Sequence, residues 1–319
     1  MNIAAHGVAP LQSVSHGSRT AWSTTAMNGK RAIVWALCLA FPTKCGLDRF
    51  HARGAPTTRV DAASVLASPA EQSADAAQDA PGRALSPLHA ESWLIELAVE
   101  GFRDARVSVP LGATQARPVV VALHGAGDRP EWACGGWRGV TDGYAFVVCP
   151  AGAPGGLPNG FVWGNDAMVE REVNAAVGAL RRRFGDHVAA GCALLAGFSQ
   201  GAIRMAPILA RSSGFCPQAA LCEGAYDALD RSFARGFVGS GGRRMLLGCS
   251  QPYCAKVFRE REAPLSAAGI DVRIVDSGGR THNLNGEMVS ALREAWPWLV
   301  RDDERWLPYL AERRRPPSD

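Results

Sequence analysis

The sequence predicts an α/β protein, a three-layer α/β/α sandwich built on a mostly parallel sheet of about eight strands. Short, continuous apolar runs such as 118–123 and 145–149 are typical of strands that are buried on both faces. These runs alternate with segments whose apolar residues recur at helical spacing, which favours a parallel sheet covered by helices. A chain of 319 residues with 47% hydrophobic residues is long enough to form one large core.

The strands can be placed in chain order. Residues 93–99 and 106–109 alternate in polarity and predict two antiparallel edge strands. The later strands are predicted from apolar runs at 118–123, 145–149 and 193–198 and from three further short apolar segments at 219–222, 245–248 and 272–276. Asn165 or Asp166 can cap the first long helix, and Gly185 ends it. In such sheets ligands bind beyond the carboxyl ends of the strands, so the loops there are the candidate site.

Residues 1–41 form an N-terminal extension with a signal-like segment. The segment 27–31, which ends in Lys30 and Arg31, precedes an apolar run at 32–41, as in a secretory signal. Ten apolar residues are too few to span a bilayer, which needs about 20. We hypothesise that Met27 is the true start; the alternatives are a long signal from Met1 and a disordered tail with an apolar patch. A lipid anchor on Cys45 is disfavoured because Lys44 is not a small residue.

The remaining chain divides by composition into three further parts. Residues 42–91 are rich in Ala, Ser, Pro, Asp and Gln, and we expect a disordered linker because so few large apolar residues cannot offset the ordering entropy. Residues 92–302 form the folded domain, and residues 303–319 are expected to be a polar C-terminal tail. We expect no membrane span in the mature chain.

The net charge and the spacing of cysteines and histidines indicate whether to expect a nucleic acid or a metal as a partner. The formal net charge is +4, and no basic stripe is interleaved with aromatic residues, so we expect no nucleic-acid partner. No Cys-x-x-Cys or His-x-x-x-His spacing is present, and we expect neither a metal nor a cofactor. The oligomeric state does not follow from the sequence.

The nine cysteines fit an exported protein, in the periplasm, outside the cell or on its surface. Removal of Cys38 with the signal leaves an even number that permits full pairing. Cys216 and Cys222 would stand at opposite ends of one strand, too far apart for a bridge. The expected pairs are Cys134 with Cys149, Cys192 with Cys216, and Cys249 with either Cys254 or Cys222.

The segment around Ser199 predicts a nucleophile turn. An apolar run stops at Gly197-Phe198-Ser199-Gln200-Gly201 and then becomes helical. A chain with 35 glycines can contain Gly-x-Ser-x-Gly by chance. The prediction therefore rests mainly on the strand and helix that flank the motif. The glycines allow strand and helix to approach closely, and the serine hydroxyl is then exposed above the sheet.

A serine hydroxyl needs a neighbouring base to act as a nucleophile at neutral pH. His282 lies in the loop directly after the last strand, from which it can reach the Ser199 turn. His89 belongs to the linker and His187 lies at the wrong end of the sheet, whereas His124 is expected to shape its own loop. We therefore predict His282 as the base, against the alternative of an ordinary surface histidine.

Acyl transfer also needs donors that bind the developing oxyanion. The amide of Gln200 opens the helix after Ser199, and Ala126 follows His124 and Gly125 in the loop after the third strand. We predict these two backbone amides as the oxyanion hole.

These motifs and their order resemble the α/β-hydrolase superfamily from about Ser92 to Val300. Leu-His-Gly-Ala-Gly-Asp at 123–128 and Gly-Phe-Ser-Gln-Gly-Ala at 197–202 are similar to the carboxylesterase/acyl-protein thioesterase branch, and secreted polyester depolymerases and feruloyl esterases share much of this layout. The resemblance implies Ser199 as nucleophile, His282 as base, and the amides of Ala126 and Gln200 as the oxyanion hole.

The chain departs from this family at the acid of the triad. Families of this kind often carry Gly-x-x-Asp-Pro after the penultimate core strand, and here Gln251 stands at the aspartate position of residues 248–252. An amide cannot stabilise an imidazolium by charge. The candidate replacements are Glu223, ranked first, Asp227 and Asp276; a Ser-His dyad is the remaining alternative.

Together these features predict a serine-dependent hydrolase that cleaves ester or thioester bonds of a small or polymeric substrate through an acyl-enzyme on Ser199. The alternatives are a weak or inactive binding protein on a hydrolase scaffold, which Gln251 would explain, and a serine peptidase. We expect the loop 150–164 and the segment 223–243 to line the substrate pocket, although their composition does not identify the substrate.

Overall fold

The computed structural model of the chain describes residues 84–284 and 286–315. The signal-like segment, Met27, Cys45 and most of the expected linker lie outside these residues.

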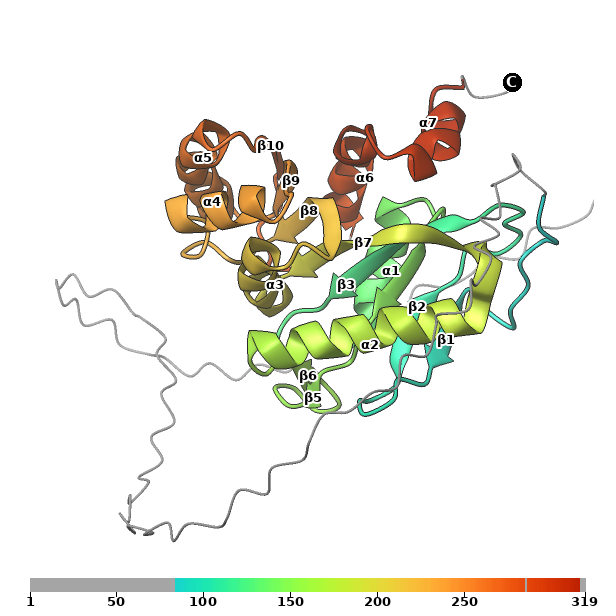
Figure 1. Ribbon diagram of the computed structural model, residues 1–319. Coiled ribbons are helices and arrows are strands. Elements are labelled where there is room, and N and C mark those ends of the chain that lie inside the picture. The colour runs from blue at the N-terminus through green and yellow to red at the C-terminus, as the bar shows by residue number, and fades with distance from the viewer. Residues whose placement is uncertain (1–83, 285, 316–319) are drawn as a thin grey trace, which may run out of the picture. The chain divides into compact units, whose positions relative to one another are not determined.

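A single eight-stranded sheet forms the centre of the described part (Figure 1), in the order β1-β2-β4-β3-β7-β8-β9-β10. β2 runs antiparallel to both of its neighbours, and all pairs from β4 to β10 are parallel. The strands are β1 (Leu94–Leu97), β2 (Ala105–Ser108), β3 (Arg117–Leu123), β4 (Phe146–Cys149), β7 (Val188–Phe198), β8 (Phe215–Cys222), β9 (Arg244–Cys249) and β10 (Asp271–Asp276). Each of the eight expected strands is present.

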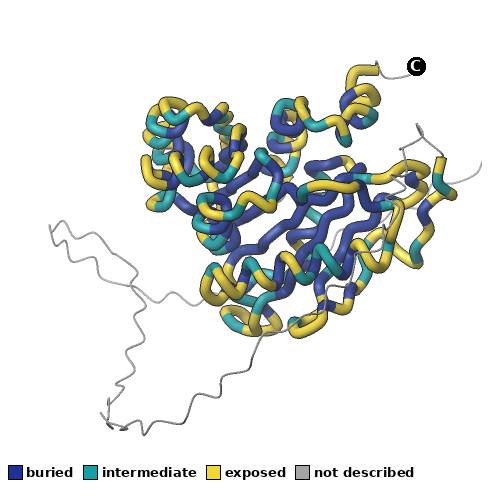
Figure 2. Tube along the Cα trace, in the orientation of Figure 1, coloured by how far each residue is buried: buried dark blue, intermediate teal, exposed yellow. Residues whose placement is uncertain are grey.

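Helices cover both faces of this sheet. Alternate residues of β3 show why: Val119 and Val121 pack in one hydrophobic cluster and Val120 and Ala122 in the other, all of them buried. Figure 2 shows the strands as the buried centre and the helices with exposed outer sides. The helices are α1 (Pro130–Val140), α2 (Asp166–Phe184), η1 (Gly185–His187), α3 (Gln200–Arg211), α4 (Arg231–Gly239), α5 (Pro252–Ala267), α6 (Gly286–Val300), η2 (Glu304–Trp306) and α7 (Leu307–Arg313).

The two clusters divide the helices into layers. Buried residues of α2, α3, α4 and α5 belong to the first cluster, and those of α1, α6, η2 and α7 belong to the second. This strand order, with one reversed strand and helices on both faces, is that of the α/β-hydrolase fold, and the predicted three-layer class is confirmed. Within the described residues, no helix has the length and hydropathy needed to cross a bilayer.

The start of α2 distinguishes between the two expected caps. The Asn165 side chain accepts a hydrogen bond from the Met168 amide at 2.9 Å, whereas Asp166 is the first helical residue and pairs with Arg211. Asn165 is therefore the cap, and the helix ends at Gly185, which has a positive φ of 50°. The structure also contains a small hairpin that the sequence did not predict, formed by β5 (Ala153–Pro154) and β6 (Phe161–Val162).

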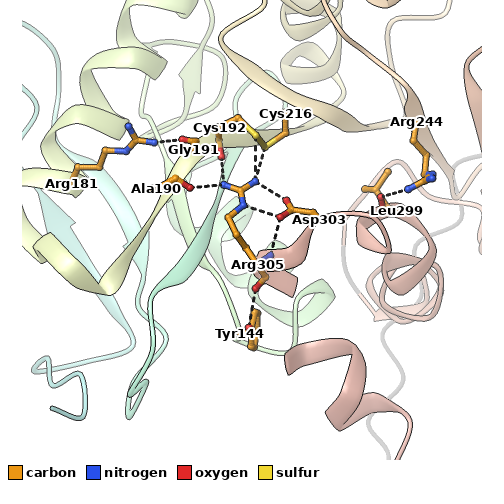
Figure 3. A network of polar contacts seen from close by, with 10 residues as sticks. All are labelled: Tyr144, Arg181, Ala190, Gly191, Cys192, Cys216, Arg244, Leu299, Asp303 and Arg305. Carbon is orange, nitrogen blue, oxygen red and sulfur yellow. Dashed lines mark hydrogen bonds and ion pairs between the residues drawn. A yellow bond between two sulfur atoms is a disulfide. The ribbon is translucent and has the colours of Figure 1, made fainter. Parts of the chain in front are cut away.

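Both ends of the described chain pack on the domain beyond the expected bounds of 92 and 302. Leu88 is buried, and its amide donates to the Ala113 carbonyl at 3.0 Å. At the other end, where a polar tail is expected, η2 and α7 form and Trp306 is 1% exposed. Arg305 connects this segment to the end of the sheet, because its guanidinium donates to the Cys192 carbonyl at 2.7 Å and to Asp303 (Figure 3).

Three disulfides join the pairs Cys134–Cys149, Cys192–Cys216 and Cys249–Cys254, with Cα–Cα distances of 5.9, 4.9 and 5.5 Å. Between the two partners considered for Cys249, the structure has Cys254. Cys222 is buried and unpaired with any described cysteine, at the opposite end of β8 from Cys216. Full pairing of the cysteines is thus not seen among the described residues.

Candidate active site

The turn between β7 and α3 places Ser199 in a strained backbone conformation. Its φ of 51° and ψ of −118° are unusual for a residue with a side chain. A Cβ atom at Gly197 would lie 2.8 Å from the Ala202 amide nitrogen, and one at Gly201 would lie 2.4 Å from the Leu123 carbonyl oxygen. Both glycines are therefore required by the close approach of strand and helix, as the Gly-x-Ser-x-Gly spacing predicts.

The imidazole of His282 lies against the Ser199 hydroxyl. His282 is in the loop between β10 and α6, and its Nε2 is 2.8 Å from Ser199 Oγ. The ring packs on Phe198 with 4.9 Å between the ring centroids, which fixes its orientation. The side chain remains 43% exposed, so solvent reaches it.

Glu223 occupies the other side of the imidazole. One carboxylate oxygen, Oε2, is 3.1 Å from His282 Nδ1, and the side chain is fully buried at 0% exposure. Because a carboxylate only accepts, Nδ1 carries the proton and donates to it. Nε2 is then free to accept from the Ser199 hydroxyl.

Backbone amides stabilise the charge of Glu223. Its second oxygen, Oε1, accepts from the Ser250 amide, from the Ser250 hydroxyl at 2.8 Å and from the Gln251 amide at 3.0 Å. Burial raises the pKa of the Glu223 carboxyl, but the hydrogen bonds from His282, Ser250 and Gln251 outweigh it and hold the pKa below its usual range. A buried carboxylate is thus kept charged beside the imidazole.

The other two candidate acids lie elsewhere. Asp276 binds Arg259 at 3.1 Å and the Gly278 amide at 3.1 Å. Within residues 84–284 and 286–315, the carboxylate hydrogen-bonded to His282 is that of Glu223, and Asp227 makes no hydrogen bond to the ring. Gln251 stands at the N-cap position of α5 without a side-chain capping hydrogen bond, and its backbone amide donates to the Glu223 carboxylate.

The two predicted oxyanion donors flank the Ser199 turn. β3 pairs with β7 so that Leu123 lies opposite Gly197, and the loop after β3 that contains Ala126 is therefore beside the turn. In this loop the Gly125 amide donates to Asp128 and the Gly127 amide donates to the Phe161 carbonyl. Among the described residues, the amides of Ala126 and Gln200 have no acceptor of their own.

His124 and Trp163 form hydrogen bonds that stabilise this loop. His124 is 1% exposed, and its ring nitrogens lie 2.7 Å from the Gly125 carbonyl oxygen and 3.0 Å from the Ala151 carbonyl oxygen. The Trp163 indole donates to the His124 carbonyl at 2.8 Å, and the Trp163 amide donates to the Gln200 side chain at 2.9 Å. The predicted structural role of His124 agrees with these contacts, whereas Trp163 and Ser250 were not predicted, because their partners are distant in sequence.

A pocket of about 680 Å³ opens beside His282. It lies between the start of α1 and the segment that leads into α6, and Phe198 forms part of its wall. The lining residues are His124, Asp128, Trp132, Ala133, Gly135, Gly136, Phe198, His282, Asn283, Leu284, Gly286 and Val289.

The pocket beside His282 is formed by other segments than the two expected to line a substrate pocket. Neither the loop 150–164 nor the segment 223–243 contributes a lining residue. The hairpin in the first segment packs on the loop after β3 instead, where a Cβ atom at Gly127 would lie 3.3 Å from the Leu157 side chain. In the second segment, the Tyr226 carbonyl is bound by Arg261 at 3.2 Å.

No group of three or more His, Cys, Asp or Glu side chains is arranged to bind a metal within the described part of the chain.

Comparisons with known proteins are limited to structural likeness. No family model matches the chain, and no curated protein is significantly similar to it. Similar solved structures include the carboxylesterase of Bacillus cereus, 17% identical with a TM-score of 0.40 over 58% of this chain and 88% of that chain. A carboxylesterase from Mesorhizobium loti is 18% identical, with a TM-score of 0.44 over 67% and 98% of the two chains. S-formylglutathione hydrolase (FrmB) from Staphylococcus aureus is 12% identical, with a TM-score of 0.47 over 65% and 98%. Likeness at this identity concerns the fold alone.

Proposed function

We propose that this chain is a serine hydrolase that cleaves carboxylic ester or thioester bonds through an acyl-enzyme on Ser199. The observation that carries the proposal is the continuous hydrogen-bonded chain from Ser199 Oγ through His282 to Glu223, with distances of 2.8 and 3.1 Å. It lies at a strained strand-to-helix turn, where a serine hydroxyl is exposed above the sheet.

In the proposed acylation step, Ser199 Oγ attacks the carbonyl carbon of the substrate. His282 Nε2 takes the hydroxyl proton and then donates it to the leaving oxygen or sulfur. Glu223 holds the imidazole in the tautomer that can accept this proton and stabilises the imidazolium by charge. The amides of Ser250 and Gln251 already bind the carboxylate, so little reorganisation is needed as the charge develops.

The carbonyl oxygen of the substrate becomes negatively charged, and it needs hydrogen-bond donors on the side away from His282. The amides of Ala126 and Gln200, which have no acceptor in the described part of the chain, are available for this role, and Gln200 also lies at the N-terminus of α3, where the helix dipole favours an anion. Deacylation reverses the roles, with His282 activating a water. The partial exposure of the His282 ring gives that water a path.

The alternative of an inactive binding protein rested on Gln251 at the expected position of the acid. A buried carboxylate at hydrogen-bond distance from His282 removes that reason and favours a hydrolase. No contact in the described chain specifically favours a peptidase.

A fluorophosphonate probe tests the proposed nucleophile. We expect the wild type to be labelled and Ser199→Ala to remain unlabelled. Failure of the wild type to react, or equal labelling of Ser199→Ala, would overturn the proposal. A panel of p-nitrophenyl esters and acyl thioesters with matched acyl groups would then separate esterase from thioesterase activity.

We also propose that the protein is exported. The three disulfides support an oxidising compartment, because such bonds are rare in proteins of a reducing cytosol. Fractionation of the producing cells, followed by N-terminal sequencing of the protein, tests this. Recovery of the chain in the cytosol with residues 1–26 retained would contradict both export and the Met27 start.

A further inference from the structure

The pocket beside His282 has a defined position relative to the reacting atoms of an ester. Its wall includes the His282 ring and Phe198, the residue that precedes the nucleophile. The other walls come from the first turns of α1, with Trp132 and Gly136, and from Leu284. The pocket therefore lies on the side of Ser199 that the base occupies.

The chemistry of acylation decides which part of a substrate reaches this side. When the bond from Ser199 Oγ to the carbonyl carbon forms, the bond from that carbon to the alcohol oxygen breaks. The proton of Ser199 passes through His282 Nε2 to that alcohol oxygen, so this oxygen must lie within hydrogen-bond reach of Nε2. The group attached to it extends from beside His282.

The walls of the pocket are mainly apolar. Trp132, Phe198, Leu284 and Val289 present aromatic and aliphatic surface, and among the described lining residues Asp128 and Asn283 are the polar side chains besides the two histidines. Trp132 is 57% exposed, which leaves much of its indole uncovered in the free protein. The volume of about 680 Å³ is within the range of pockets that bind molecules much larger than a short alcohol.

The wall is held together by a close contact between α1 and the segment after His282. A Cβ atom at Gly136 would lie 3.1 Å from the Leu284 carbonyl oxygen, and one at Gly139 would lie 2.8 Å from the Val289 side chain. These contacts keep α1 against Leu284 and Val289, so the apolar surface is a preformed part of the fold.

We propose that this pocket binds the alcohol part of the ester and that the protein prefers bulky, apolar, ring-containing alcohols over short ones. The inference rests on the proposed serine hydrolase function and adds the substrate class. Trp132 is the main specificity-determining residue, since its exposed indole gains the most contact from a ring placed beside His282.

The test uses the full chain and acetate esters of primary alcohols with similar leaving-group acidity: ethanol, hexanol and 2-phenylethanol. The readout is kcat/KM, because it reports acylation even if deacylation limits kcat. We expect 2-phenylethyl acetate to be hydrolysed about 30-fold more efficiently than ethyl acetate, since transition-state contacts with a ring are absent for the short alcohol. A second series of ethyl esters with acyl groups of increasing size should show a much smaller preference.

The variant Trp132→Ala should lower kcat/KM for 2-phenylethyl acetate about tenfold, through lost apolar contact, and for ethyl acetate by less than about twofold. Trp132→Phe should restore most of the preference. Tyr253→Ala is the matched control, because Tyr253 is an aromatic residue in the first turn of α5 that is 67% exposed and does not line the pocket. It should leave the preference unchanged.

The outcomes separate this inference from the function on which it rests. If ethyl and ring-containing esters are hydrolysed equally, or if Trp132→Ala changes the acyl series and not the alcohol series, the inference is overturned while the hydrolase function stands. If Ser199 reacts with a fluorophosphonate and no ester in either series is hydrolysed, both the ester chemistry and the pocket assignment fail.

Discussion

The carboxylate of Glu223 lies 3.1 Å from Nδ1 of His282, although the two residues follow different strands of the sheet. Glu223 comes directly after β8, whereas the position usual for this acid follows β9, where Gln251 stands. The loop after β9 still contributes, because the Ser250 and Gln251 amides bind the carboxylate of Glu223. The carboxylate beside His282 and the amides that bind it thus come from two adjacent strand ends.

Replacement of Glu223 by glutamine tests this arrangement. The amide keeps the size of the side chain but presents N–H groups to Nδ1, which favours the tautomer that cannot accept a proton from Ser199. We expect kcat to fall by about 10³ to 10⁴-fold, as in triads whose acid is made neutral. The measurement is steady-state hydrolysis of p-nitrophenyl acetate.

Asp227→Asn and Asp276→Asn are the controls for this variant, because in the described residues neither carboxylate is hydrogen-bonded to His282. Each should keep activity within about threefold of the wild type, as expected for substitutions outside the site. Full activity in Glu223→Gln would favour a Ser-His dyad, and a large loss in Asp276→Asn would assign the acid to that residue.

The positions of the strands along the chain and of the candidate site could be predicted because both depend on local patterns. Continuous apolar runs such as 118–123 mark strands that are buried on both faces, and the glycines around Ser199 follow from clashes within one turn. His282 could be predicted from its place after the last strand. Each of these predictions requires only the order of elements along the chain.

The parts that were missed depend on contacts between distant segments. Sequence reasoning ranked Glu223 first among three acids, but only the geometry distinguishes it from Asp276, which is closer to His282 in the chain. The pocket beside His282 could not be predicted because α1 meets the segment before α6 through Gly136 and Leu284, a contact without a local signal. The burial of Trp306 was also missed, because its neighbours in the sequence are charged.

The lowered pKa of Glu223 predicts a specific acid dependence of stability. Above about pH 4.3, the ordinary pKa of a glutamate, both folded and unfolded chains carry the charged carboxylate and the full stabilisation is present. As the pH falls toward the lower pKa of the folded state, the unfolded chain binds the proton first and the stabilisation is lost. The free energy of unfolding of the wild type should therefore fall more steeply between about pH 5 and pH 3 than that of Glu223→Gln.

Urea unfolding at several pH values, followed by tryptophan fluorescence, measures this difference. Taking the difference between the two proteins removes the contribution of the other carboxylates. Parallel curves for the wild type and Glu223→Gln across the acid range would show that the pKa of Glu223 is not lowered by folding.

Gly201→Ala should destabilise the domain by about 3 kcal/mol, at the upper end of the cost of overpacking. The added Cβ would lie 2.4 Å from the Leu123 carbonyl oxygen, so α3 must move away from β3. The matched control is Gly239→Ala, because Gly239 is helical and a Cβ there meets nothing within 4 Å. That variant should be neutral or more stable by up to about 1 kcal/mol, through the better helix propensity of alanine. Equal stability of the two variants in urea unfolding would contradict the close approach at the Ser199 turn.

Arg305→Ala should destabilise the domain by about 2 to 3 kcal/mol, the range for hydrogen bonds made by a charged group. The guanidinium is 20% exposed and donates to the Cys192 carbonyl, the Ala190 carbonyl and Asp303, so its loss removes a donor from the part-buried Cys192 carbonyl and from the Asp303 carboxylate (Figure 3). Arg301→Ala is the control, because that side chain is 49% exposed and its ion pairs are at the surface. It should change stability by less than about 0.5 kcal/mol.

The network is remote from His282, so folded Arg305→Ala protein should label with fluorophosphonate at the wild-type rate. Lower stability in urea with normal labelling would establish a purely structural role for the C-terminal segment, whereas unchanged stability would show that η2 and α7 are not anchored through Arg305.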